Sequence, residues 1–430
     1  MNKTYRIGFM MTVCLVLFGC KEKEPISETK GLESLDVCSE NAVSSTILDA
    51  YGDKTDIVIY NGASHNAFAE QYALFQEYSD QGRVSLHYYD VLTGKSSYYC
   101  FDPGCEHKPP QFDMITGELI SDFCMAFDLG GGTVAIRNDN CYFFNFPSLF
   151  CADLGGENRR VISELKFPYS SSFVEEIYTA THYFRSYTYS NEMIEKVDEN
   201  GKHSWWLGEP LDRRKVVIIM VPLSGGDPKE IFCEDDLYDL SILNIKEYNG
   251  HLYFTTGGLD VPYKTLPNIQ EDMEGYYKAL KQHNHTKVYD YDITNDHLTD
   301  LTETLSIQEG GEYDFANGYI VKCSEGDEPG VLYDHFGQRI RDLPFAVGHL
   351  VQSDHYILAL WAMNGEYWYY LYDPVEDKVL QKVDGSNMIL LEAAVGESYY
   401  GRNNNQIYYI SSKDFWEGHA EKVNVISDNR

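Results

Sequence analysis

The chain has 430 residues and a formal net charge of −33 at pH 7, with 67 acidic against 34 basic side chains. Such a negative field repels nucleic acid and anionic surfaces, so it excludes a nucleic-acid-binding function and favours soluble, cationic or metal-bearing partners. The 35 tyrosines favour strands over helices, because aromatic residues fit a pleated, half-buried surface.

The first 19 residues have the features of a secretory signal. Lys3 and Arg6 give a positive N-terminus, and an apolar run over residues 7–18 follows. This run is too short to span a bilayer, which takes about 20 residues, but it suits the apolar region of a signal peptide. It closes with Leu17-Phe18-Gly19-Cys20, which resembles the lipobox of bacterial lipoproteins.

This resemblance implies that Cys20 becomes the first residue of the mature protein and carries acyl chains, such as palmitate. The lipid would hold the protein at the cell membrane, on its extracytoplasmic face, because more than one acyl chain gives stable anchoring. An ordinary signal peptide or a membrane anchor is the alternative interpretation. Residues 20–37 have little apolar material to bury, so we expect a flexible tether there.

A short unit recurs through residues 38–430, which we expect to form one domain. A β-rich run, often ending in an aromatic residue and Asp, is followed by a polar turn and a second β-rich run. Each copy predicts a β-hairpin, and the Asp is expected to cap the turn through backbone amides rather than to act in catalysis or bind calcium. The copies are residues 86–100, 149–162, 217–232, 288–301, 331–343, 369–383 and, more weakly, 407–423.

A second hairpin precedes most copies, with turns at residues 138–140, 249–250, 317–318, 354–355 and 396–397. Two hairpins make four strands, and the late units recur about every 40 residues, which is the span of one β-propeller blade. We therefore predict an all-β fold, a β-propeller of seven four-stranded blades. Six or eight blades are the neighbouring alternatives, because the first and last copies are weak, and a pair of β-sandwiches is the other architecture.

A lipobox followed by degenerate, Tyr-rich blades resembles the propeller-type surface lipoproteins of Gram-positive bacteria. The motifs that carry the resemblance are the Tyr-Asp and Thr-Gly-Lys residues of the first copy, Tyr89-Asp90 and Thr93-Gly94-Lys95, and the turns of the type Asn249-Gly250. The resemblance covers most of the mature chain and implies the fold and the location. It implies little chemistry, because the activity of those proteins is largely unknown.

Three insertions interrupt the early repeats, near residues 101–123, 190–215 and 259–286. In an up-and-down blade, the loop between the second and third strands leaves from the same face as the link to the next blade. We therefore expect all three insertions to crowd one rim of one face, where function tends to sit on loops held by a rigid scaffold.

Two of these insertions contain residues that stand out. Trp205 and Trp206 are adjacent in a polar, charged segment, where they could form a platform for stacking sugars or binding protein. Equally, they could fold back as a plug over the blade. Residues 272–283 predict a short helix, with Met273, Tyr276, Tyr277 and Leu280 on one stripe that serves packing.

Cysteines gather at the start of the first insertion. Cys100, Cys105, His107 and Cys124 could complete a tetrahedral Cys3His set for a structural zinc, the only cofactor that the sequence suggests. A disulfide among the three cysteines is the competing interpretation, since exported proteins permit one, and unpaired thiols are the third. Four more cysteines are expected to act as small core residues, namely Cys141, Cys151, Cys233 and Cys323.

The sequence contains no nucleophile elbow, zinc-protease helix, phosphate-binding loop or dinucleotide fingerprint. The prediction is therefore a non-enzymatic binding module at the cell surface, which uses one propeller face to bind an extracellular carbohydrate or protein. The alternative is an extracytoplasmic carbohydrate-active hydrolase or lyase at the central opening, with acidic residues and a divalent cation. A sensory or envelope-assembly partner is a third hypothesis, and the ligand itself is not named by any motif.

Overall fold

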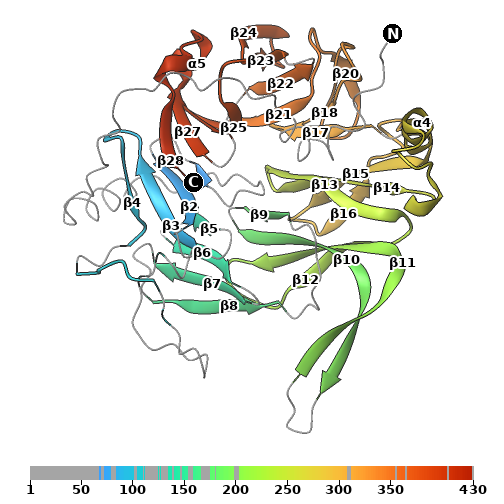
Figure 1. Ribbon diagram of the computed structural model, residues 1–430, viewed down its shortest axis with the longest axis horizontal. Coiled ribbons are helices and arrows are strands. Elements are labelled where there is room, and N and C mark those ends of the chain that lie inside the picture. Colours follow the sequence, from blue (N-terminus) through green and yellow to red (C-terminus); the bar gives the residue numbers. More distant parts are fainter. Residues whose placement is uncertain are drawn as a thin grey trace.

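In a computed structural model the protein is a seven-bladed β-propeller, a ring of four-stranded antiparallel sheets (Figure 1). The structure describes residues 67–68, 72–78, 84–100, 104–109, 111, 124, 126, 134–137, 140–145, 148–153, 158–165, 175–179, 181–197, 203–307, 311–353, 356–363, 366–403 and 406–428. The predicted signal peptide, Cys20 and the tether lie outside these residues. Within them, no helix has the length and apolar character needed to cross a membrane.

The blades follow one another along the chain, and each takes its described strands from one continuous segment. The first three are β1 (Ala67–Phe68), β2 (Tyr72–Tyr78), β3 (Val84–Asp90) and β4 (Lys95–Tyr98); β5 (Val134–Arg137), β6 (Asn140–Asn145), β7 (Ser148–Asp153) and β8 (Arg160–Glu164); and β9 (Glu176–Tyr178), β10 (His182–Val197), β11 (His203–Pro222) and β12 (Lys229–Glu234). The predicted hairpins of residues 86–100, 149–162 and 217–232 are β3–β4, β7–β8 and β11–β12.

The remaining four blades have the same order. They are β13 (Tyr238–Tyr248), β14 (His251–Leu259), β15 (Asn284–Asp292) and β16 (His297–Asp300); β17 (Tyr313–Ala316), β18 (Tyr319–Lys322), β19 (Val331–Tyr333) and β20 (Arg339–Asp342); β21 (His349–Ser353), β22 (Ile357–Met363), β23 (Glu366–Asp373) and β24 (Lys378–Asp384); and β25 (Leu390–Val395), β26 (Ser398–Asn403), β27 (Gln406–Ser411) and β28 (Asn424–Asp428). The innermost strands of the last two blades also pair in parallel, Gln352 with Ala393.

Aspartates at the ends of third strands cap the following turns, as the repeat predicts. The Asp373 carboxylate accepts hydrogen bonds from the backbone amides of Val375 and Glu376, at 2.9 and 3.0 Å. Asp90, Asp292 and Asp334 bind backbone amides in the same way. In these four blades the repeated Asp therefore satisfies the turn backbone locally, which is the role that asparagine and aspartate play in Asx turns.

Buried aromatic residues join each blade to the next. A hydrophobic cluster spans every neighbouring pair of blades around the ring. Tyrosine suits these layers because its ring is apolar and its hydroxyl can still find a partner. The Tyr369 hydroxyl, for example, donates to the Ile389 carbonyl in the next blade at 3.3 Å and accepts from the Leu391 amide at 3.0 Å.

The first and last blades close the ring by packing. Phe68 of β1 stacks on Tyr400 of β26, with ring centroids 4.7 Å apart. Phe75, Ala393 and Ile426 are buried in the same cluster. Within the part of the chain that the structure describes, no strand from one end of the chain is inserted into the blade at the other end.

The predicted helix is present as α4 (Met273–His283), in the connection between β14 and β15, after a short 3-10 helix η1 (Tyr263–Thr265). Asp272 caps it by accepting a hydrogen bond from the Gly275 amide at 2.8 Å. The predicted stripe is only partly right. Tyr276 is buried and hydrogen bonds with the Tyr263 hydroxyl at 3.0 Å, whereas Met273 is 57% exposed.

The last copy of the repeat differs from a simple hairpin. Helix α5 (Ser412–Trp416) and the 3-10 helix η2 (Ala420–Lys422) separate β27 from β28. Ser411 accepts a hydrogen bond from the Asp414 amide, and its hydroxyl donates to the Asp414 carboxylate at 2.8 Å. This Ser-x-x-Asp pattern is a helix-start signal that the hairpin interpretation of residues 407–423 did not use.

Candidate functional site

The predicted metal ligands come together at the start of the link between the first two blades. Cys100 lies two residues after the end of β4, and Cys124 is held beside the same segment because its backbone amide donates to the Lys108 carbonyl at 3.0 Å. One ligand atom from each of Cys100, Cys105, His107 and Cys124 lies within 4.8 Å of the other three. No disulfide joins the described cysteines.

Two polar contacts organise this cysteine–histidine cluster. His107 Nδ1 lies 3.5 Å from Cys124 Sγ, and the His107 backbone amide donates to Cys105 Sγ at 3.4 Å. The Ala126 amide makes a similar bond to the Cys124 sulfur. Cys124 is buried, and the other three side chains are half-buried.

An aromatic stack fixes the histidine. The ring of Tyr98, the last residue of β4, stacks on His107 with centroids 4.8 Å apart and 20° between the planes. His87 of β3 covers the Tyr98 ring at 4.3 Å. Burial, followed by the proximity of His107, lowers the pKa of His87 to about 4. His87 is therefore neutral at physiological pH, so it adds no positive charge beside the cluster.

Without a nearby positive charge, this environment disfavours the thiolate form of the cysteines. The hydrogen bond that the Cys124 thiol makes with Cys100, followed by burial, raises the pKa of Cys124 far above its usual range. Burial is also the main cause that raises the pKa of Cys105. These sulfurs become good metal ligands only if a cation offsets the charge, because the thiolate is the ligand form.

Of the other four cysteines, Cys151 and Cys323 are buried as expected. Cys233 contradicts the prediction. It lies in the outer strand β12 and is exposed, between the buried Phe232 and Glu234, so the strand alternation directs it to solvent. The side chain of Cys141 lies outside the described ones.

The segment with the tryptophan pair continues the propeller strands as a long ribbon. β10 and β11 pair from His182 opposite Pro222 to Val197 opposite His203, with register shifts around Asn191. This ribbon projects beyond the ring at the lower right of Figure 1. It is thus an extended pair of strands and not an irregular loop.

The backbone register places Trp205 opposite Glu195 and Trp206 opposite Ile194. Their side chains lie outside the described ones. Successive positions of a paired strand belong to opposite faces of the ribbon. A platform that uses both tryptophans together does not follow from this register, because positions 205 and 206 belong to different faces.

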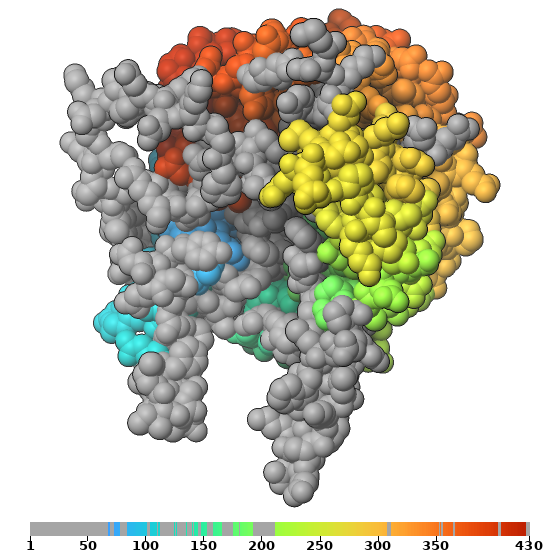
Figure 2. Space-filling model, turned by 45° about the vertical axis from the view of Figure 1, so that its right-hand side comes forward, coloured from blue at the N-terminus to red at the C-terminus, as the bar shows by residue number. Residues whose placement is uncertain are grey.

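The α4 insertion stands on the surface of the ring, shown in yellow in Figure 2. Its base is closed by Asp260, whose carboxylate lies 2.7 Å from His283 Nδ1 and 3.2 Å from His285 Nε2. Burial would raise the pKa of Asp260, but the hydrogen bonds from these two histidines lower it. Lys281 ties the helix to Glu325 of the next blade at 2.8 Å.

The strand order shows how these features relate. Because every blade is antiparallel, the β10–β11 and β14–β15 connections leave from the same face as the link after β4. We call this the insertion face. It carries the ribbon, the α4 insertion and the cysteine–histidine cluster, whereas the short capped turns after third strands lie on the opposite face.

The inner strands place charged groups toward one another between blades four, five and six. Asp314 of β17 is buried, and its carboxylate accepts hydrogen bonds from the Leu350 amide at 2.8 Å and from the Asn244 side chain. Its other near group is His349 Nδ1, at 3.0 Å. Burial would raise the pKa of Asp314, but His349 and then Lys246 hold it well below its usual range.

A second acidic group adjoins the inner strand β9. Glu175 is half-buried, and burial raises its pKa to about 7, an effect that Lys246 opposes and Glu176 reinforces. Glu176 itself is paired with Arg185 of β10. Sequence reasoning missed Asp314 and Glu175, because acidic residues are numerous and their contacts join residues far apart along the chain.

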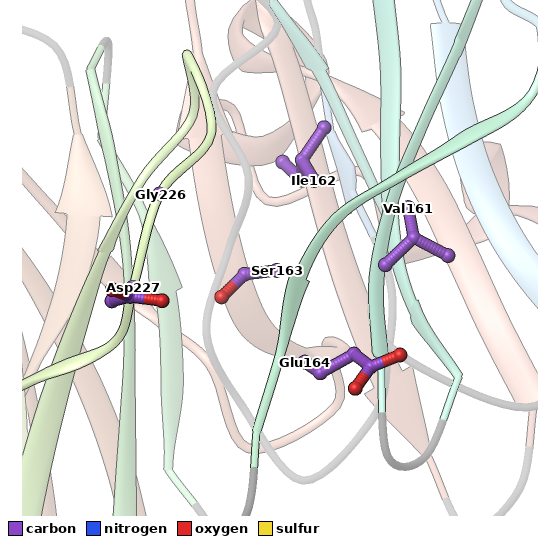
Figure 3. A pocket seen from close by; sticks show the side chains of 6 residues that line it. All are labelled: Val161, Ile162, Ser163, Glu164, Gly226 and Asp227. Atoms are coloured by element: carbon purple, nitrogen blue, oxygen red, sulfur yellow. The ribbon is translucent and has the colours of Figure 1, made fainter.

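A cavity of about 360 Å³ lies between blades two and three (Figure 3). It is open to solvent and lined by Val161, Ile162, Ser163, Glu164, Gly226 and Asp227. The Ser163 hydroxyl is buried without a hydrogen-bond partner in the described structure. The lining therefore offers two carboxylates and one hydroxyl but no cationic residue, and these groups do not indicate a particular reaction.

Comparisons with known proteins find distant structural similarity and no family. No protein-family model matches the chain, and no curated protein matches it significantly. Among solved structures, dipeptidyl peptidase 4 from Porphyromonas gingivalis is similar over 85% of this chain and 52% of its own, at 12% identity and a TM-score of 0.42.

Two further solved structures show the same level of similarity. The acylaminoacyl peptidase of Pyrococcus horikoshii matches at 10% identity and a TM-score of 0.40, over 84% of this chain and 50% of its own. TolB from Acinetobacter baumannii matches at 14% identity and a TM-score of 0.35, over 83% and 80%. The chain spans about half the length of either peptidase.

Proposed function

We propose that this protein is a cell-surface lipoprotein, anchored through Cys20, whose propeller is a non-enzymatic binding module for an extracellular carbohydrate or protein. The observation that carries the binding role is the concentration of additions on the insertion face. The ribbon and the α4 insertion both extend the link between second and third strands of neighbouring blades. On the opposite face, the described connections after third strands are short turns, except for the longer α5–η2 connection of the last blade. The short turns offer little to a partner.

The contacts of the buried acidic residue on the inner strand β17 favour a binding function over a catalytic one. Asp314 is the most buried of the described acidic groups near the axis, and backbone and side-chain donors already occupy it. A carboxylate held in this way joins blades and is not positioned to transfer a proton to a substrate.

Anchoring is tested by feeding a bacterial host that expresses the full chain an alkyne-tagged palmitate. We expect label on the wild type and on Cys38→Ala, and none on Cys20→Ala. Label that persists in Cys20→Ala would reject the lipoprotein assignment.

Binding is tested with the detergent-purified full chain on an array of polysaccharides and surface proteins. Because positions 205 and 206 belong to different faces of the ribbon, we expect retention to be lost in only one of Trp205→Ala and Trp206→Ala. Retention should be kept in Val375→Ser, a residue that is 77% exposed in a turn on the side of the ring away from the insertion face. Equal loss in all three variants would contradict a role for the insertion face.

A hydrolase or lyase at the central opening is the second candidate, and one observation favours it. The pKa of Glu175 is raised to about 7, which suits a general acid. Turnover of a polysaccharide by the wild type, abolished in Glu175→Gln, would establish this function in place of simple binding.

A further inference from the structure

We propose that Cys100, Cys105, His107 and Cys124 bind one zinc ion in a closed tetrahedral site, which fastens the link between blades one and two to β4. The proposal depends on where these side chains lie and does not require the binding function above. The four ligand atoms converge within 4.8 Å of one another. Zinc bound by sulfur at about 2.3 Å and by nitrogen at about 2.0 Å needs them about 3.5–3.8 Å apart, so a contraction of at most about an ångström completes the site.

The donor set selects the ion. Thiolate and imidazole favour zinc over magnesium and calcium, which prefer oxygen ligands. Three sulfurs and one nitrogen equal the four ligands of structural zinc sites and leave no open position for water. The ion would therefore have a structural and not a catalytic role.

The surroundings of the ligands also fit a metal. The backbone amides of His107 and Ala126 point at two of the sulfurs, where they stabilise thiolate charge. The Tyr98 ring fixes the imidazole plane with Nδ1 on the Cys124 side. Outer-shell contacts that orient a ligating histidine are a regular part of zinc sites.

A disulfide explains the cluster less completely. It would join two of the three sulfurs at about 2.05 Å and leave the third thiol and His107 without a shared purpose. Zinc uses all four side chains.

A second group of metal-binding residue types provides a contrast. Asp414, Glu417 and His419 also approach one another near α5. However, Lys422 already pairs with Asp414, and Glu417 and Glu421 both contact His419. These exposed ion pairs satisfy one another and carry no separate inference.

The test measures metal and thiols on the full chain, purified from host membranes under anaerobic conditions in zinc-containing medium. We expect one zinc per chain by mass spectrometry. Cys100, Cys105 and Cys124 should resist alkylation until a chelator is added. Cobalt exchange should produce the visible absorption of a tetrahedral sulfur-rich site, a signal that depends on the ligands and not on overall stability.

Variants separate the site from adventitious binding. Cys105→Ser and His107→Gln, both at half-buried positions, should lower zinc occupancy at least tenfold and abolish the cobalt spectrum. Cys233→Ser, an exposed cysteine of the outer strand β12, should retain both. A disulfide mapped among the three cysteines, or zinc retained in full by both ligand variants, would overturn the proposal.

Discussion

Blades five and six contrast with blades three and four. In blades five and six, short turns join the strands, and Asp334 and Asp373 satisfy the turn amides within a few residues. In blades three and four, the second and third strands extend into a ribbon of 16- and 20-residue strands or are joined through η1 and α4. The short turns are held by local hydrogen bonds. The additions are held mainly by contacts of their own, such as the β10–β11 pairing and Asp260 with His283, and Lys281 adds an exposed ion pair to Glu325 of the next blade.

This difference teaches that the ring and its additions are stabilised separately. Changes in the ring should lower global stability, and changes in the additions should alter local mobility or binding. The cysteine–histidine cluster is the exception that we expect, because it fastens a long link directly to a blade.

Removal of the metal is expected to have the largest effect on stability. A chelator should lower the free energy of unfolding by about 4 kcal/mol if free zinc is a thousandfold above its dissociation constant. Thermal denaturation of the full chain, with and without chelator, checks this expectation. Cys105→Ser should show no chelator effect, and an unchanged melting temperature in the wild type would contradict a stabilising metal.

Removing the central carboxylate should have the next largest effect. Asp314→Ala leaves the buried Leu350 amide and the half-buried Asn244 side chain without their acceptor, at a cost of about 3 kcal/mol. Asp342→Ala, which removes an exposed ion pair with Arg339, should cost less than about 0.5 kcal/mol. Urea denaturation measures both. Equal effects would show that Asp314 does not hold the blades together.

The same carboxylate gives a pH dependence whose sign is fixed. The folded-state pKa of Asp314 lies well below the value of about 3.9 in an unfolded chain. Its contribution is therefore complete above about pH 4 and is lost as the pH falls toward the folded value. The difference in urea midpoint between wild type and Asp314→Asn should be constant from pH 7 to 5 and should shrink toward pH 3. A difference that grows on acidification would contradict this assignment.

Loss of the cap of a single turn should lower the free energy of unfolding by a smaller amount. Asp373→Ala removes the cap of the β23–β24 turn and should cost about 1 kcal/mol, since two amides lose their acceptor to solvent. Asp373→Asn keeps an acceptor oxygen and should recover most of the loss in the same denaturation assay. If the Asn variant is as unstable as the Ala variant, the cap is not the cause.

The smallest global effect is expected in the α4 insertion. Tyr276→Phe removes the hydroxyl contact with Tyr263 and should cost about 0.5 kcal/mol. Hydrogen exchange should rise in residues 260–283 and stay unchanged in blades five and six. Uniformly faster exchange would show that the insertion is part of the ring's stability.

The fold was predictable because its signal is local and repeated. Asp292, Asp334 and Asp373 recur at blade spacing, and each caps a turn within its own hairpin. The cysteine–histidine cluster was also predictable from the sequence, since its four residues lie within residues 100–124. By contrast, the Asp314–His349 contact joins two blades and follows no local period. The ribbon register at Trp206 depends on a pairing partner that composition does not reveal.

The seam between the first and last blades has a mechanical consequence. In the lipoprotein proposed above, a pull between the cell and a bound partner would enter the described part of the ring at β1, of which the structure describes two residues. The cluster that contains Phe68 stacked on Tyr400 would then bear that load, because no described strand is shared between the first and last blades. Under tension, the ring should open at this seam first, while the capped blades on the far side keep their shape.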